Sequence, residues 1–161
     1  MIFFVVFRTL FFDGEHPQGG GVTTEIVKTP GRVELLESIL NEKQYDMDVG
    51  YENHVGISHT RWATHGGLTV PNSHPHASAD NEFVVIHNGI INNCHTLRTF
   101  LVSKGYTFKS ETDTECIPLL IHHLWSTRSE ELSFVELIER CLQQLEGTFA
   151  IVVKVRQTNN N

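Results

Sequence analysis

The sequence lacks the features that mark several common classes of protein. It contains no block of lysine and arginine residues, and its formal net charge is -7 at pH 7. An acidic chain without a basic patch does not attract nucleic acids or anionic membrane surfaces. Its apolar runs are short, whereas a helix that spans a bilayer needs about 20 apolar residues. We therefore expect neither a nucleic-acid partner nor membrane association.

Cysteine is scarce and is not spaced as in a disulfide framework. Cys94, Cys116 and Cys141 are odd in number and form no C-x-x-C pair, which favours a reducing compartment. Met1–Phe12 is apolar, but it has no basic region before the apolar run and no small-residue cleavage site after it. We therefore expect a cytoplasmic protein in which Met1–Phe12 forms a buried strand.

Motifs for phosphate and metal binding are also missing. No lysine and hydroxyl residue follow the glycines of Gly19–Gly21 at P-loop spacing, so this stretch is expected to be a plain loop. The histidines give the stronger argument for a metal site. His74-Pro75-His76 resembles a ligand pair, and Asp80 or Glu82 would supply a carboxylate. However, no H-E-x-x-H spacing is present. We expect hydrogen-bonded loop or strand-end histidines and no metal site.

What is present is one domain of mixed secondary structure. A chain of 161 residues with 40% hydrophobic content suits one packed domain. We divide it into an atypical apolar segment (1–12), the domain itself (13–156) and a polar tail (157–161) that is expected to be disordered. Strands are expected at Val22–Lys28, Val55–Ser58, Glu82–His87, Thr107–Phe108 and Thr148–Val155.

Helical spacing predicts four helices between these strands. The apolar residues of these helices lie within Val33–Leu40, Leu97–Leu101, Ile117–Leu124 and Phe134–Leu145. We expect Gly105 to end the second helix, Thr112 or Thr114 to cap the third, and Gly147 to stop the fourth. Ser133–Glu136 reads as a capping box. Strands mixed with helices indicate an α+β class with sheets covered by helices.

Candidate site residues lie where strands give way to polar residues. Arg61 presents a planar fork that matches a carboxylate, and Asp113 near a helix start can pair with an ammonium group. An amino acid offers both groups, although either residue also reads as a surface ion pair. Asn88-Gly89 is either an ordinary turn or a pair of N–H donors for an oxyanion. Spacing alone does not choose between these interpretations.

Several longer motifs resemble a known family. They are H-T-R-W-A-T-H-G at 59–66, N-S-H-P at 72–75, H-N-G-I at 87–90, G-Y-T-F at 105–108, S-E-T-D-T-E at 110–115 and Q-L-E-G-T-F-A at 144–150. Together they resemble the class II glutamine amidotransferase domain, and more narrowly that domain of the glutamine–fructose-6-phosphate aminotransferases. The resemblance runs from about Asp13 to Lys154. It implies an N-terminal-nucleophile hydrolase fold, an α/β/β/α sandwich, here incomplete, and glutaminase chemistry without a cofactor.

The resemblance also implies roles for particular residues. Arg61 would hold the α-carboxylate of L-glutamine, and Asp113 would take its α-ammonium group. Asn88 and the backbone N–H of Gly89 would form the oxyanion hole.

The remaining implied pocket residues lie in one stretch. Thr64 and His65 would line the glutamine pocket, and Trp62 would belong to a mobile loop that closes over the substrate.

The sequence departs from the family pattern at both ends. The family's N-terminal cysteine, whose thiol attacks the side-chain amide with its own α-amine as base, is absent, and Met1–Phe12 does not resemble its opening segment. The sugar isomerase modules, the only route to fructose 6-phosphate, are absent too. We expect a truncated domain that is inactive alone. A catalytically dead glutamine-binding or regulatory module that retains Arg61 and Asp113 is the alternative.

Overall fold

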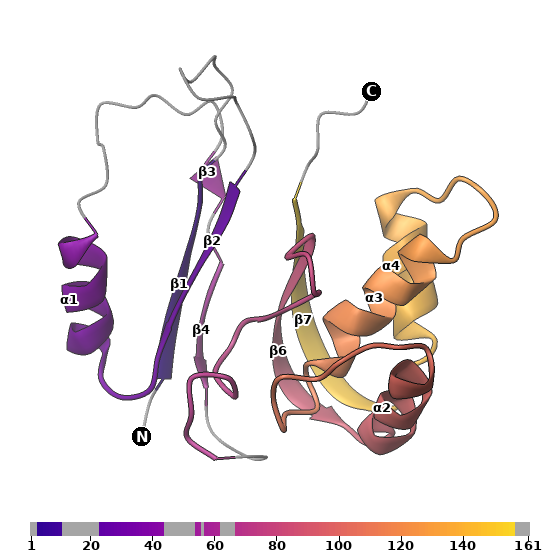
Figure 1. The fold of residues 1–161 in the computed structure, drawn as a ribbon, viewed down its shortest axis with the longest axis horizontal. Coiled ribbons are helices and arrows are strands. Elements are labelled where there is room, and N and C mark those ends of the chain that lie inside the picture. The colour runs from indigo at the N-terminus through magenta and orange to yellow at the C-terminus, as the bar shows by residue number, and fades with distance from the viewer. Residues whose placement is uncertain (1–2, 11–22, 44–53, 56, 62–66, 157–161) are drawn as a thin grey trace.

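The elements form four layers in the computed structural model, which describes residues 3–10, 23–43, 54–55, 57–61 and 67–156. Figure 1 shows one helix outside a first sheet, a second sheet facing the first, and three helices covering the far side of the second sheet. The expected α/β/β/α sandwich is confirmed. The expected polar tail and most of the glycine-rich loop lie outside the described residues.

The first sheet is organised around its N-terminal strand. β1 (Phe3–Leu10) pairs antiparallel with β2 (Thr23–Thr29) along one side, from Phe4 opposite Thr29 to Leu10 opposite Thr23. On its other side β1 pairs with β3 (His54–Val55) and β4 (Ser58–Arg61). A strand within Met1–Phe12 is thus confirmed.

Helix α1 (Val33–Glu42) covers the outer face of this sheet. Its apolar residues recur at helical spacing, and Leu36 is the fully buried one among them. Successive residues of a strand point to opposite faces of its sheet. In β2, Ile26 packs toward the second sheet, so Val27, which is also buried, points toward α1.

The second sheet is built on β6 (Phe83–Ile91), which lies between β5 (His76–Ala77) and β7 (Gly147–Val155). All pairs are antiparallel, with Phe83 opposite Val155 and Ile91 opposite Gly147. The continuous apolar start of β6 predicts burial on both faces, and this is confirmed. Val84 and Ile86 join a small cluster with Ile26 and Ile57 between the sheets.

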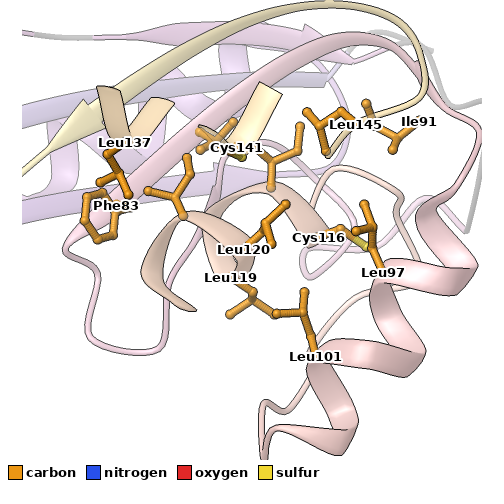
Figure 2. Close-up of a cluster of buried hydrophobic side chains, with 13 residues drawn as sticks. Phe83, Ile91, Leu97, Leu101, Cys116, Leu119, Leu120, Leu137, Cys141 and Leu145 are labelled. Carbon is orange, nitrogen blue, oxygen red and sulfur yellow. The ribbon is translucent and has the colours of Figure 1, made fainter. Parts of the chain in front are cut away.

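The large core lies between the second sheet and helices α2 (Cys94–Ser103), α3 (Cys116–Ser126) and α4 (Phe134–Leu142). Figure 2 shows its side chains converging from the three helices and from β6. Phe149, Ile151, Val153 and Val155 of β7 pack against this core, on the face that their alternation predicts. Within the described residues, no helix has the length and apolar character needed to cross a membrane.

Two predicted helix ends are confirmed. Ser133 accepts a hydrogen bond from the N–H of Glu136, whose side chain accepts one from the N–H of Ser133, which completes the capping box of α4. Gly105 adopts φ +91° just after α2. Glycine adopts this left-handed conformation at little cost in free energy, so Gly105 ends the helix.

Three local predictions and one of the two open interpretations, the Asn88-Gly89 turn, are wrong. Asn88-Gly89 makes no turn, because β6 continues through it and pairs with β7 as far as Ile91. Thr107–Phe108 is not a strand. Gly147 does not stop α4, which ends at Leu142, but begins β7.

The fourth error concerns the start of α3. Neither Thr112 nor Thr114 caps it, because their hydroxyls are engaged with His76 and His87, and Glu115 holds the N-cap position without a side-chain cap.

Gly89 provides a test of the close approach between β6 and β7. It has φ +137°, and a Cβ atom there would lie 2.0 Å from the carbonyl oxygen of Thr148. Gly89→Ala should lower the free energy of unfolding by about 2–4 kcal/mol in urea denaturation. Gly105→Ala is the control, since φ is +91° but no atom lies within 4 Å, so the loss should be about 1–2 kcal/mol. Equal losses would contradict a backbone clash at Gly89.

Candidate functional site

A pocket of about 300 Å³ lies where β6 meets the segment that precedes α3. Its lining comes from strands of both sheets and from two connecting segments. Most of the lining residues are polar, and they include a carboxylate, an amide and several hydroxyls. The lining residues are His59, His74, His87, Asn88, Gly89, Ile90, Thr112, Asp113, Thr114 and Thr148.

Asn88 and Gly89 form one wall of this pocket. Both are exposed although they lie within β6, whose preceding residues are buried. The Asn88 side chain makes no hydrogen bond with any described residue, so its amide N–H groups are free for a ligand. Gly89 is required here because Thr148 occupies the place of a Cβ atom. The wall therefore presents an amide donor beside unhindered backbone.

Asp113 forms a second wall of the pocket and is held in place by the end of β6. Its Oδ2 atom accepts a 2.8 Å hydrogen bond from the backbone N–H of Ile91. Its backbone carbonyl accepts from the N–H of Cys116, so the carboxylate lies at the start of α3, where the helix dipole stabilises negative charge. The side chain is 7% exposed. Asp113 is thus a buried anion with lone pairs left for a cationic ligand.

The segment that carries Asp113 is held by hydrogen bonds to the side chains of Arg98 and Glu115. Arg98 of α2 donates hydrogen bonds of 3.1 Å to the backbone carbonyls of Ser110 and Thr112. The Glu115 carboxylate accepts from the backbone N–H groups of Lys109 and Ser110 and from the Ser110 hydroxyl. These bonds fix the backbone of the segment, so the Asp113 carboxylate is preorganised.

His87 connects both walls through a short hydrogen-bonded chain. Its Nδ1 atom lies 2.9 Å from Thr114 Oγ1, and that hydroxyl donates to Asp113 Oδ1 over 3.4 Å. A hydroxyl that donates to Asp113 accepts from His87, which places the imidazole proton on Nδ1. Burial lowers the pKa of His87, and the negative charge of Asp113 partly opposes this effect. His87 is therefore neutral near pH 7.

The other histidines near the pocket are packed together. The His59 and His74 rings lie 4.4 Å apart between centroids, and His74 Nδ1 accepts from the backbone N–H of His87. His76 Nε2 lies 3.0 Å from Thr112 Oγ1. The expectation of hydrogen-bonded histidines is confirmed for His74, His76 and His87.

The ligand set considered for zinc is not assembled among the described residues. Asp80 and Glu82 instead lie beside His122, with potential ligand atoms within 4.8 Å of one another. The Asp80 carboxylate there pairs with His122 at 3.5 Å and accepts hydrogen bonds from Ser78 and from the N–H of Glu82.

The structure brings together only part of the predicted site. Asn88, Gly89 and Asp113 line one pocket. Arg61 is described by its backbone alone, at the end of β4 opposite Phe3.

The other predicted pocket residues, Trp62, Thr64 and His65, lie outside the described residues. His87 and Thr114 were not predicted as pocket residues. The position of His87 directly before Asn88 in the H-N-G-I motif was the available signal.

None of the cysteines lines this pocket. Cys116 and Cys141 are buried in the large core, and burial raises the pKa of each thiol to about 12. Cys94 packs against the same core. A thiolate is the reactive form of cysteine, so Cys116 and Cys141 are poor nucleophiles.

Comparison with known proteins gives a consistent set of matches. Residues 59–160 match the model of the family described as "Glutamine amidotransferase domain". A glutamine–fructose-6-phosphate aminotransferase [isomerizing] 2 from Mus musculus is 54% identical over 145 residues, which cover 88% of this chain and 21% of the relative. The Saccharomyces cerevisiae enzyme of the same name, without the numeral, is 43% identical over 136 residues, 82% of this chain and 19% of the relative. The chain thus spans about a fifth of these relatives.

Solved structures support the fold. A glutamine phosphoribosylpyrophosphate amidotransferase from B. subtilis, complexed with ADP and GMP, matches with a TM-score of 0.60 and 21% identity, covering 95% of this chain and 29% of that one. An allosteric regulatory enzyme of purine biosynthesis matches with a TM-score of 0.62 and 22% identity, covering 96% and 30%. At such identities the likeness concerns the fold alone.

The buried neutral His87 predicts a pH dependence of stability. Its pKa is lower in the folded than in the unfolded chain, so the unfolded state binds the proton more tightly. The stability that depends on neutral His87 is therefore present above its unfolded pKa of about 6.5 and is lost as pH falls below it.

Urea denaturation between pH 7.5 and 5.5 measures this loss, which for one proton cannot exceed about 1.4 kcal/mol per pH unit. His87→Gln should flatten the pH profile, and the same change at the exposed His95 should not. An unchanged profile in His87→Gln would contradict a buried neutral imidazole.

Proposed function

The chain belongs to the family of glutamine amidotransferase domains, and from this premise we propose that the pocket at the end of β6 binds L-glutamine. One observation carries the proposal: a buried carboxylate, and an amide that has no hydrogen bond to any described residue, line one pocket of about 300 Å³. A zwitterionic amino acid with a terminal amide needs both. The pocket volume also suits a ligand of this size.

The geometry supports a defined orientation of the substrate. The Asp113 carboxylate pairs with the α-ammonium group, because it is negative, fixed by Ile91 and part of the lining. Asn88 and the backbone of Gly89 face the side-chain carbonyl, where an oxyanion develops during acyl transfer.

The remaining contacts follow from the family resemblance. Arg61, the last residue of β4, takes the α-carboxylate. Thr64 and His65 complete the pocket, and Trp62 belongs to the loop that closes over it.

Hydrolysis of the amide needs a nucleophile beside this pocket. The chain contains three cysteines, and none lines the pocket. Its thiols therefore do not supply the attack, and the chain by itself binds glutamine without turning it over. A glutamine-binding or regulatory module, the second candidate function, is favoured by this same absence of a pocket thiol.

The longer relatives indicate the wider setting. In a glutamine–fructose-6-phosphate aminotransferase the amide nitrogen passes to fructose 6-phosphate, and this chain spans about a fifth of such a protein. We place it as the glutamine-binding part of such a cytoplasmic transferase, acting without a metal or other cofactor. Fructose 6-phosphate binds elsewhere in the whole enzyme.

Calorimetric titration with glutamine tests the binding proposal. Saturable binding is expected for the chain, and Asp113→Asn should weaken it at least tenfold, because a charge-assisted bond is worth about 1.5–3 kcal/mol. Asp80→Asn, which removes a carboxylate outside the pocket, should leave the affinity unchanged. Absence of binding, or equal affinities in all three proteins, would refute the assignment.

Ammonia release tests the statement about the thiols. With glutamine present, release should stay near the uncatalysed background and should not change on Cys94→Ala or after treatment with iodoacetamide. Release that is abolished by either change would show that an internal cysteine acts as the nucleophile.

A further inference from the structure

A second and larger pocket, of about 480 Å³, lies between the two sheets. We call it the inter-sheet pocket. It shares no lining residue with the pocket at the end of β6. Its lining combines apolar side chains with the charged residues Lys28, Lys109 and Glu115. The lining residues are Ile26, Lys28, Val70, Pro71, Pro75, His76, Ala77, Asn81, Lys109 and Glu115.

The alternation of β2 directs a lysine into this pocket. Ile26 packs against Val84 and Ile86 of the second sheet. Lys28 lies two residues further along β2, so its side chain leaves the same face. Its stem therefore leaves β2 between the sheets, and Lys28 is one of the residues that line the pocket.

The Lys28 ammonium group makes no hydrogen bond and no ion pair with any of the described residues. Burial lowers its pKa to about 8, although Glu115 acts in the opposite direction and Lys109 in the same one. Lys28 is half-buried, and removing an ammonium group from water without a bonded anion is unfavourable. The site is thus short of one acceptor for Lys28.

Glu115 does not fill this need, because its carboxylate is already engaged. Its oxygens accept from the N–H groups of Lys109 and Ser110, at 2.8 and 2.7 Å, and from the Ser110 hydroxyl at 2.6 Å. The charged residues of the lining are two lysines, Lys28 and Lys109, and one glutamate, Glu115. One added negative charge would balance them.

We propose that the inter-sheet pocket binds a compact organic monoanion, a carboxylate with an apolar body, with Lys28 as its counter-ion. The carboxylate pairs with the Lys28 ammonium group, and Lys109 adds a second positive charge at the pocket lining. The apolar body contacts Ile26, Val70 and Pro71. Val70 and Pro71 are exposed, so the ligand enters from their side.

Benzoate is a suitable probe, and benzamide is its neutral counterpart of the same shape. Titration of the full chain, followed by NMR, should show saturable binding of benzoate and at least tenfold weaker binding of benzamide. Benzoate should also raise the pKa of Lys28, measured from its side-chain NMR signals, because a bound anion favours the ammonium form.

Lys28→Met keeps the length of the stem and removes the charge. It should weaken benzoate binding at least tenfold while leaving benzamide unaffected. The control is Lys104→Met at the end of α2, which changes net charge equally outside this pocket. Circular dichroism checks that each variant is folded.

Three results would overturn the proposal. They are the absence of saturable benzoate binding, equal affinity for benzoate and benzamide, or an equal loss in Lys28→Met and Lys104→Met. Glutamine binding at the other pocket is measured separately, so its failure does not affect this test.

Discussion

The hydrogen bond from the backbone N–H of Ile91 to the Asp113 carboxylate is the interaction on which the pocket depends. It joins the last residue of β6 to the segment that starts α3. Among the described residues, the other hydrogen bond between the wall with Asn88 and the wall with Asp113 is the His87–Thr114 contact. The bond also satisfies an N–H group at a strand end while it orients a carboxylate. One bond therefore serves both the fold and the site.

β6 carries the second constraint, because it contributes to both clusters and to the pocket. Phe83 and Val85 face the helices, while Val84 and Ile86 face the first sheet. The strand is thus held on both sides before it reaches Asn88. Gly89 and Gly147 then allow the β6 and β7 backbones to approach where a Cβ atom would clash. A rigid strand with an unobstructed end suits a group that must meet a ligand in one fixed position.

Local patterns in the sequence predicted what local interactions determine. The buried start of β6, the amphipathic α1 and the capping box at Ser133 depend on neighbours in sequence, and all three were predicted correctly. The sequence left Asn88-Gly89 open between a turn and a pair of donors, because its extended conformation depends on pairing with β7. Thr112 and Thr114 were misread as caps because their hydroxyls pair with histidines 36 and 27 residues away. Lys28 lies between the sheets because the two sheets pack face to face, and the spacing of residues in the sequence does not predict this packing. The conformations and hydrogen-bond partners of the polar site residues thus depend on contacts with residues far away in the sequence.

The central claim is that Asp113 is fixed by Ile91 before any ligand arrives. Amide hydrogen exchange in the full chain without glutamine tests it most directly. We expect slow exchange at the Ile91 N–H and a selective acceleration there in Asp113→Ala, with the core amide of Leu137 unchanged. Fast exchange at Ile91 in the unaltered chain, or no effect of Asp113→Ala, would contradict a pocket preorganised by this bond.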